Sequence, residues 1–190
     1  MGALHLTLAS ASPRRLDLLA RIGIVPDAVV PAAIDESPLP AEPPRGYAMR
    51  IAREKALAVS APGHVLAGDT VVAAGRRILP KAEDEETARR CLQLLSGRRH
   101  RVLSALVLKA PDGRFRERLS ETVVRFKRLS AEELASYLAG GEWRGKAGGY
   151  AIQGSGESLI QAIHGSHSGV MGLPLFETRA LLRAAGFALG

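Results

Sequence analysis

The sequence predicts an α/β fold built as a single domain over residues 1–190. Segments with the two-residue period of strands alternate with segments of helical period along the whole chain, which is typical of this class. A length of 190 residues suits one domain. Apolar residues make up 46% of the chain and charged residues 24%, a balance that excludes disorder, collagen-like structure and a coiled coil.

The first elements are predicted to be a strand, a tight turn and a helix. His5 and Thr7 alternate with leucines, which is the period of a strand. Ser12 favours an N-cap and Pro13 the first helical position, because proline lacks the N–H group that would be unpaired there. Gly23 is suited to end the helix.

The middle of the chain predicts two helices on either side of a buried strand. Prolines indicate a loop, an apolar run indicates a buried strand, and acidic residues at the start of the second helix complement its positive dipole end. The expected elements are a loop at 38–44, a helix at 47–59, a strand at 65–72, a turn at 75–77, a short strand at 78–79 and a helix at 83–96.

The last part of the chain predicts a β-hairpin followed by mixed elements. A Pro-Asp-Gly turn joins the two hairpin strands, and Ser130 with Glu133 forms a capping box at the start of a helix. The expected elements are strands at 102–108 and 118–126, a helix at 130–141, a short strand at 150–153, a loop at 165–172 and a helix at 174–185.

Charge and cysteine content limit the classes of function. Lys and Arg number 26 against 19 Asp and Glu, a net charge of +7 that favours a polyanionic partner such as nucleic acid, a nucleotide or an acidic surface. Cys91 is the single cysteine, on the apolar stripe of a predicted helix, so it is expected in the core. With no leader and no apolar run near ~18 residues, we expect a cytosolic protein without a membrane span.

The turn from Ser10 to Arg15 is the first candidate binding site. A helix N-terminus offers free N–H groups and positive potential to an anion. Ser10 adds a hydroxyl, while Arg14 and Arg15 add guanidinium groups that match phosphate geometry. The alternative is a plain helix cap followed by two solvated arginines.

Lys55 is the second candidate. It lies seven residues after Ala48 and four after Ile51, which places a lysine on the apolar stripe of the 47–59 helix, where it needs a partner. The buried face could instead run through Met49, Ala52, Ala56 and Val59, leaving Lys55 at its edge. Helical spacing alone leaves both open.

Acidic residues form the third candidate group. Asp69, followed by Thr70, lies near the end of the buried 65–72 strand, where a carboxylate must be paired, bound to metal or protonated. The alternative for Asp69 is to accept loop N–H groups. Asp35 and Glu36 could join it around a hard cation, although their spacing alone favours a solvated acidic loop.

Two further polar residues complete the candidates. Lys81 precedes an acidic helix start, and its simplest role is to balance the acids at 83–86. Gln153 follows small residues at 146–151 that allow close backbone approach, and its amide can read a nucleobase edge as donor and acceptor. The alternative for Gln153 is the end of an edge strand.

Two motif-like matches carry no function. Residues 140–146 fit G-x-x-x-x-G-K, but Ala147 replaces the required Ser or Thr, and the segment follows a helix rather than a strand. His164 and His167 lack a third ligand nearby, so no metal site is predicted there.

Taken together, these segments resemble the Maf family of nucleoside triphosphate pyrophosphatases. They occur in one order along nearly the whole chain: LASASPRR at 8–15, IDES at 34–37, AREKA at 52–56, GDTVV at 68–72, LLSG at 94–97, HRV at 100–102, KAGGYAIQG at 146–154 and GLPL at 172–175.

The resemblance implies an activity and a fold. The activity is hydrolysis of a nucleoside triphosphate to the monophosphate and pyrophosphate, with a divalent cation (Mg²⁺ or Mn²⁺), in the cytoplasm. The fold is an elongated, curved mixed sheet flanked by helices around a central substrate cleft, of the Maf and inosine triphosphate pyrophosphatase type. Such proteins are often homodimers, and no nucleic-acid or membrane partner is expected.

The resemblance also implies roles for individual residues. Asp69 matches the family's general base, and Arg14, Thr70 and Gln153 match positions tied to substrate choice. Arg, Thr and Gln are the residues of the branch that acts on dTTP and UTP, whereas the branch that prefers 7-methyl-GTP has Trp and Gln at the first two positions. Asp69 and Glu36 are expected to hold the cation. The expected substrate-binding residues are Ser10, Arg14, Arg15, Lys55, Thr70, Lys81 and Gln153.

The chain departs from the family pattern at two places, and two rival functions stay open. Lys81 lies in Pro-Lys-Ala rather than Gly-Lys-Pro, and Gly169 replaces an Asn. One rival is a Maf-type hydrolase of modified or purine triphosphates. The other is a non-enzymatic, basic RNA-binding or regulatory protein, against which the few, scattered aromatic residues argue because they offer no stacking platform.

Overall fold

A computed structural model describes residues 4–188 and contains a mixed sheet of seven strands within that range. The order is β2-β1-β3-β6-β7-β9, and β4 pairs with β3. The strands are β1 (Leu6–Ala9), β2 (Ala28–Val29), β3 (His64–Ala74), β4 (Arg77–Leu79), β6 (Arg99–Lys109), β7 (Phe115–Phe126) and β9 (Ile160–His164). A separate two-stranded sheet pairs β5 (Lys81–Ala82) with β8 (Lys146–Ala147).

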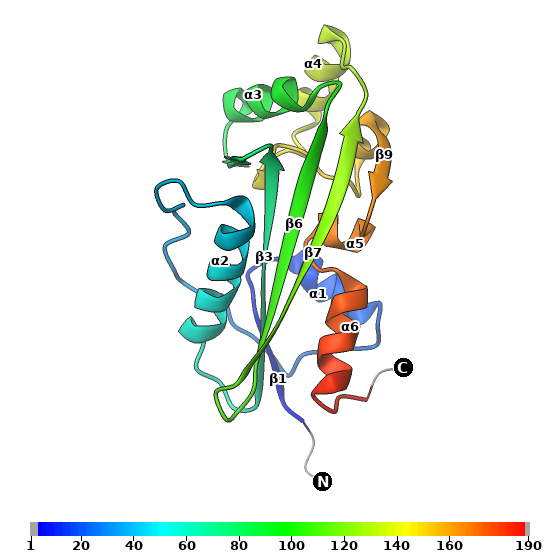
Figure 1. Cartoon of the computed structure of the whole chain (residues 1–190). Coiled ribbons are helices and arrows are strands. Elements are labelled where there is room, and N and C mark those ends of the chain that lie inside the picture. Colours follow the sequence, from blue (N-terminus) through cyan, green and yellow to red (C-terminus); the bar gives the residue numbers. More distant parts are fainter. Residues whose placement is uncertain (1–3, 189–190) are drawn as a thin grey trace.

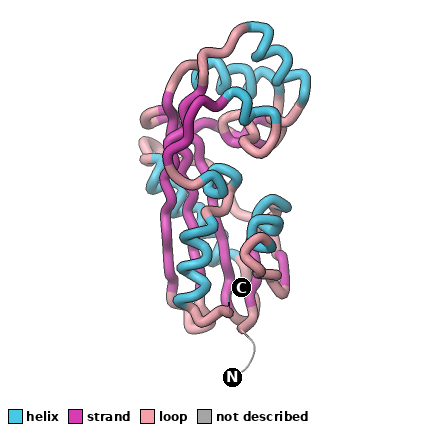
Figure 2. The backbone as a smooth tube through the Cα atoms, turned by 90° about the vertical axis from the view of Figure 1, so that its right-hand side faces the viewer, coloured by secondary structure: helices cyan, strands magenta, loops and turns pink. Residues whose placement is uncertain are grey.

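Helices cover both faces of the long, twisted strands β3, β6 and β7, as Figures 1 and 2 show. Helix α2 lies on one face, α1, α5 and α6 lie against the other, and α3 and α4 pack together at one end. The helices are α1 (Pro13–Ala20), α2 (Pro44–Ala58), α3 (Glu85–Leu95), α4 (Ala131–Gly140), α5 (His167–Met171) and α6 (Leu175–Ala184), with a 3₁₀ helix at Ser155–Leu159.

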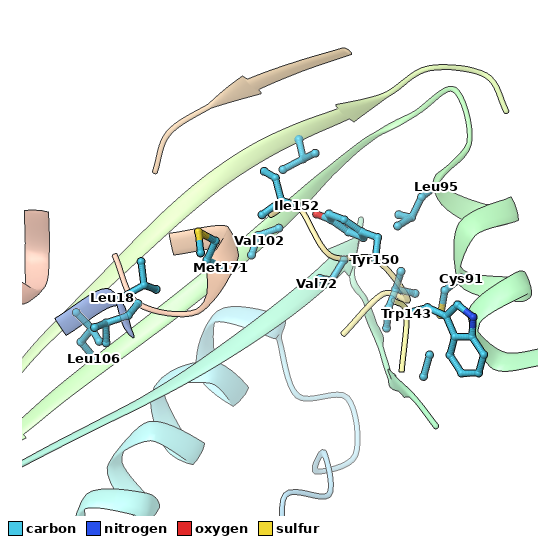
Figure 3. Close-up of a cluster of buried hydrophobic side chains, with 14 of the residues drawn as sticks. Leu18, Val72, Cys91, Leu95, Val102, Leu106, Trp143, Tyr150, Ile152 and Met171 are labelled. Atoms are coloured by element: carbon cyan, nitrogen blue, oxygen red, sulfur yellow. The ribbon is translucent and has the colours of Figure 1, made fainter. Parts of the chain in front are cut away.

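Alternation along β3 divides the core into two clusters. Val65, Ala67 and Val71 pack in one cluster with Ile51 of α2. Even-numbered residues such as Leu66 belong to the cluster on the opposite face. Figure 3 shows this second cluster running from Leu18 and Leu106, past Met171 and Val102, to Cys91 and Trp143. A strand buried on both faces explains the continuous apolar run in the sequence.

Most predicted elements are confirmed, with boundaries shifted by a few residues. The α2 helix starts at Pro44 rather than Tyr47, and the capping box of Ser130 and Glu133 at α4 forms as expected. Cys91 is buried as expected. Ser12 takes the N-cap position of α1, but its side chain makes no capping hydrogen bond.

Two predictions at the end of the chain are wrong, and one strand there is missed. Residues 150–153 form a turn, because the preceding Gly148 and Gly149 both adopt positive φ angles of 70° and 72° and end the ladder of β8. Residues 165–172 contain the helix α5, which Ser166 caps by accepting a hydrogen bond from Gly169 N. Strand β9 was not predicted at all. Within residues 4–188, no helix is both long and apolar enough to cross a bilayer.

Candidate active site

A break in the strand pairing of β3 creates the site. β1 pairs with β3 from His64 to Ala67, and β4 pairs with it from Val72 to Ala74. Within the described chain, residues 68–71 therefore have no strand partner on that edge, although β6 pairs with all of them on the other edge. At this break the consecutive side chains of Asp69 and Thr70 both border one hollow of about 320 Å³.

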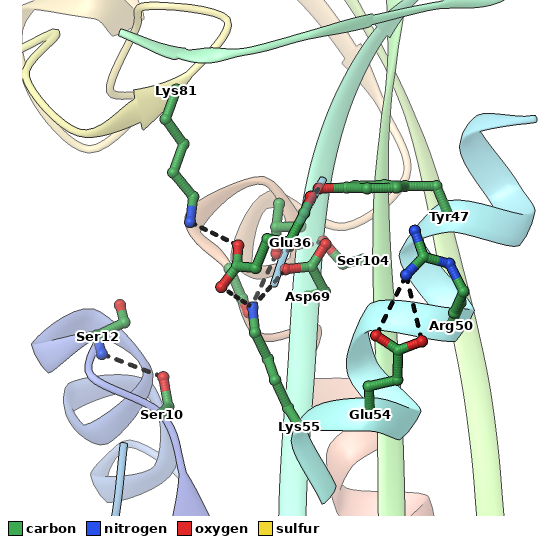
Figure 4. Close-up of polar contacts among 12 residues, drawn as sticks. Ser10, Ser12, Glu36, Tyr47, Arg50, Glu54, Lys55, Asp69, Lys81 and Ser104 are labelled. Carbon is green, nitrogen blue, oxygen red and sulfur yellow. Dashed lines mark hydrogen bonds and ion pairs between the residues drawn. The ribbon is translucent and has the colours of Figure 1, made fainter. Parts of the chain in front are cut away.

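Lys55 joins two carboxylates on the α2 side of the break (Figure 4). Its Nζ atom lies 2.8 Å from Asp69 Oδ1 and 2.9 Å from Glu36 Oε1, and its side chain is only 9% exposed. The sequence left the position of Lys55 open, and the structure places it on the buried face of α2. Asp69 therefore accepts from an ammonium group rather than from a loop N–H.

Lys81 approaches the same pair of acids from the other side. Its Nζ atom donates to Glu36 Oε2 at 2.9 Å, so the expectation that it balances the acids at 83–86 is wrong. Burial disfavours the charged form of Glu36, but hydrogen bonds from Lys81 and Lys55 outweigh burial and lower its pKa below the usual 4.5. Two lysines and two acids thus form one chain of contacts.

Arg15 fastens the opposite wall of the hollow. Its Nε atom donates to Gly172 O at 2.8 Å and its Nη1 atom to Ser10 Oγ at 3.2 Å. A longer contact of 3.5 Å links Nη2 to Thr70 Oγ1. Burial lowers the pKa of Arg15, while the nearby charge of Asp69 opposes that shift. Arg15 therefore connects β1, β3 and the end of α5.

Arg14, in contrast, has an uncommitted guanidinium group. Within residues 4–188, no hydrogen bond or ion pair joins it to another side chain, and burial lowers its pKa. It lines the same hollow as Ser10 and Ser12 at the start of α1. Ser12 N donates to Ser10 Oγ at 3.1 Å, so the turn is held by its first serine.

Residues of the segment 145–153 also line the hollow. Gln153 lines it with an exposed side chain, beside Tyr150 and Ile152. Lys146 of β8 also lines it, although the sequence did not single this lysine out as a site residue. Burial and the charge of Arg14 lower the pKa of Lys146. The one sequence feature that could have identified Lys146 as a site residue is its position directly before the Gly-rich segment at 147–149.

All the predicted site residues are brought together, except Asp35. The nine that line the hollow are Ser10, Arg14, Arg15, Glu36, Lys55, Asp69, Thr70, Lys81 and Gln153. Asp35 does not line this hollow, and its carboxylate accepts a hydrogen bond from Ser37 N at 2.9 Å. Sequence reasoning also missed Tyr47 and Arg50, which hold the loop that carries Glu36.

The donor set fits a small, hard divalent cation. No group of three His, Cys, Asp or Glu side chains suited to a metal occurs among the described residues. Mg²⁺, however, is usually bound through one or two carboxylates, with water and substrate phosphates supplying the rest. Asp69 and Glu36 are two such carboxylates, and the cationic Lys55 that now lies between them marks a position where positive charge is stabilised.

The arrangement is suited to a polyanionic ligand. Cationic groups from four separate segments surround one hollow, and the carboxylate of Asp69 on β3 lies among them. Such a site can bind a phosphate chain and direct a water molecule at it.

Comparisons with known proteins agree with this chemistry. A family model described as Maf-like protein matches residues 5–185. A Novosphingobium aromaticivorans protein named dTTP/UTP pyrophosphatase is 66% identical over 185 residues, which are 96% of this chain and 92% of that protein. A Rhodospirillum rubrum protein of the same name is 64% identical, over 97% of this chain and 90% of its own.

The fold is also similar to that of a solved structure at low sequence identity. The HAM1 protein from Coxiella burnetii matches with a TM-score of 0.53 at 15% identity, covering 96% of this chain and 100% of that one. The likeness supports the expected mixed α/β architecture and nothing about chemistry.

Proposed function

The chain belongs to the Maf family, and from this premise we propose that it hydrolyses dTTP and UTP to the monophosphate and pyrophosphate. One observation carries the proposal: a single hollow combines two carboxylates with the cationic side chains of Arg14, Lys55 and Lys81. A triphosphate carries several negative charges, which the cationic side chains can bind. Its α-phosphorus must be attacked by water, which a nearby carboxylate can activate.

Binding of the phosphate chain is assigned to the cationic wall. Arg14 has free guanidinium donors that can take a phosphate oxygen pair. Lys81 is 53% exposed, so it can turn from Glu36 towards a phosphate without uncovering the core. Arg15 contributes positive potential, while its donors hold Ser10 and Gly172 in place.

Asp69 is assigned the role of general base. Its carboxylate borders the hollow and is oriented by the hydrogen bond from Lys55. In the proposed reaction, Asp69 takes a proton from a water molecule as that water attacks the α-phosphorus. The bond from the α-phosphorus to the bridging oxygen breaks, and pyrophosphate leaves in line with the attack.

A divalent cation is part of the proposal, held by Asp69 and Glu36 with phosphate oxygens. When bound, such an ion neutralises charge on the phosphate chain and on the departing pyrophosphate. The two lysines that contact Glu36 keep its carboxylate ionised and directed at this position.

The nucleobase is assigned to the end of the hollow formed by Gln153. Uracil and thymine present a donor N–H between two acceptor carbonyls, and an amide can both donate to and accept from that edge. Thr70 lines the same hollow, and its hydroxyl contacts Ser104 Oγ at 3.3 Å. Thr70 and Gln153 are also the residue types that the sequence resemblance associates with the pyrimidine-acting branch of the family.

The remaining expectations stay predictions. Uridine and thymidine triphosphates are cytoplasmic metabolites, so the activity is assigned to the cytoplasm. A homodimer and the absence of a nucleic-acid partner are expected from the family resemblance alone.

Release of pyrophosphate from a panel of triphosphates tests the function. The panel holds dTTP, UTP, CTP, ATP, GTP and 7-methyl-GTP, each with Mg²⁺, with Mn²⁺ and with EDTA. We expect turnover of dTTP and UTP that requires the cation and yields pyrophosphate rather than orthophosphate. Preference for a purine triphosphate, or salt-dependent RNA binding with no hydrolysis, would contradict the proposal.

A further inference from the structure

The loop that carries Glu36 has little regular structure to hold it. It runs from the end of β2 to the start of α2, and no strand or helix forms between residues 30 and 43. Glu36 also borders a second hollow of about 440 Å³, which shares Asp69 and Lys81 with the first. Because open space lies on both sides of Glu36, packing alone does not fix it, and hydrogen bonds must set its position.

The hydroxyl of Tyr47 supplies the first of these bonds. It donates to the main-chain carbonyl of Glu36 at 2.7 Å, and the Tyr47 ring is buried against the sheet. Burial and the nearby charges of Asp69 and Glu36 raise the pKa of Tyr47 to about 12. The hydroxyl therefore remains protonated at neutral pH and acts as a donor. Figure 4 shows it reaching from α2 towards the acids.

Arg50, one turn further along α2, supplies the second attachment. It binds both carboxylate oxygens of Glu42 at 2.8 Å and donates to Ser37 O at 3.1 Å. Glu42 is 10% exposed and also accepts from Leu39 N at 3.0 Å. On its other side, Arg50 donates to Glu54 at 3.2 Å, which holds the guanidinium in place. Two points of the loop, Ser37 in its middle and Glu42 near its end, are thus tied to one side chain.

One helix therefore carries three groups that act on the acids. Lys55 contacts Asp69 and Glu36 directly, whereas Tyr47 and Arg50 hold the loop from which Glu36 projects. We propose that Tyr47 and Arg50 are positioning residues, which set the spacing between Glu36 and Asp69 that a divalent cation and a phosphate chain require. This inference rests on the proposed function, because it assumes that Glu36 acts in cation binding.

The variant Tyr47→Phe tests the first attachment, since it removes the hydroxyl and keeps the buried ring. We expect kcat for dTTP to fall about 3- to 10-fold, the effect of one lost hydrogen bond. The KM for dTTP should stay near the wild-type value, because no phosphate or base contact is removed. Affinity for Mn²⁺, measured by electron paramagnetic resonance with a non-hydrolysable α,β-imido analogue of dTTP, should weaken by a similar factor.

The variant Arg50→Ala tests the second attachment, with Arg53→Ala as its control. Arg53 lies on the same helix and pairs with Glu117 at 3.1 Å, and among residues 4–188 no hydrogen bond or ion pair joins it to the loop. We expect Arg50→Ala to weaken Mn²⁺ binding and to speed hydrogen exchange in residues 36–42, with partial recovery in Arg50→Lys. Arg53→Ala should behave as wild type. Equal effects of the two alanine variants would show a general loss of helix stability and overturn the proposal.

A double-mutant cycle separates this inference from the proposed function. If Tyr47 acts through Glu36, then Tyr47→Phe should not weaken Mn²⁺ binding further in a Glu36→Gln protein. Additive losses, or wild-type Mn²⁺ affinity in Tyr47→Phe, would overturn the positioning role and leave the hydrolysis itself intact. Wild-type Mn²⁺ affinity in Glu36→Gln would remove Glu36 from the cation site, and the positioning role of Tyr47 and Arg50 would fall with it.

Discussion

Asp69 and Thr70 are consecutive residues whose side chains point to opposite faces of β3, and both still border one hollow. Asp69 meets Lys55 on the α2 side, while Thr70 meets Arg15 and Ser104 on the other. One hollow reaches both side chains because β3 has no neighbouring strand on this edge between the end of β1 and the start of β4. The break in strand pairing therefore gives both side chains of one dipeptide access to the same hollow, as the proposed roles of Asp69 as base and Thr70 in substrate binding require.

Two adjacent arginines should respond differently to removal. Arg14→Ala should lower kcat/KM for dTTP about 10- to 100-fold, the loss of a charge-assisted hydrogen bond, while the melting temperature stays within about 2 °C. Arg15→Ala should lower the melting temperature by about 5–10 °C, because Ser10 and Gly172 lose their buried donor. Steady-state kinetics measure kcat/KM and calorimetry measures the melting temperature of each variant. An unchanged kcat/KM in Arg14→Ala would remove it from the site.

Gln153 should control the choice among pyrimidines. Gln153→Glu exchanges a group that donates and accepts for one that only accepts. Uracil and thymine then lose a donor partner, while the amino group of cytosine gains an acceptor. We expect the ratio of kcat/KM for UTP to that for CTP to fall at least about 10-fold. Competition assays with both nucleotides measure the ratio. An unaltered ratio would show that Gln153 does not contact the nucleobase.

The ion pairs of Glu36 should make stability depend on pH. Its pKa is lower in the folded protein than the usual 4.5, so its stabilising contribution is complete above pH 4.5 and is lost as the pH falls through the folded value. Glu36→Gln should therefore reduce the free energy of unfolding at pH 7 and should matter progressively less below pH 4.5. Urea denaturation at several pH values measures the difference. A difference that grows towards low pH would contradict the ion-pair geometry.

His100 should produce a separate loss of stability in mild acid. It is buried beside Phe126, its Nε2 atom lies 2.8 Å from Tyr150 Oη, and burial lowers its pKa from 6.5 to about 4. The unfolded chain binds a proton more readily between these values, so stability should fall by about 3 kcal/mol as the pH drops from 6.5 to 4. His100→Phe should remove this slope. If the stability of His100→Phe still falls over this pH range as it does in the wild type, groups other than His100 cause the acid sensitivity.

Much of the fold follows from local sequence, and the exceptions have physical causes. The apolar run of β3 and the capping box at Ser130 depend on short-range rules, and both were predicted correctly. The turn at 150–153 was mistaken for a strand, because Gly148 and Gly149 take left-handed angles that bring them against Val72 and Ala88, a tertiary requirement. The same limit hid β9, whose pairing with β7 is non-local.

The candidate site was predictable as a set of residues but not as a network. Helical spacing could not decide whether Lys55 was buried, because two overlapping stripes on α2 fit equally well. The partner of Lys81 could not be found either, since Glu36 lies 45 residues away in the sequence. Tyr47 and Arg50 resembled ordinary helix residues, because their role depends on a loop whose path only the three-dimensional structure defines.

Substitution of the carboxylate on β3 tests the central claim most directly. Asp69→Asn keeps the shape of the side chain and removes the proton acceptor, so pyrophosphate release from dTTP should fall about 10²- to 10⁴-fold. Binding of a non-hydrolysable dTTP analogue, measured by calorimetry, should largely survive because Arg14 and Gln153 remain. If Asp69→Asn releases pyrophosphate at the wild-type rate, the base has been wrongly assigned and the account of this site fails.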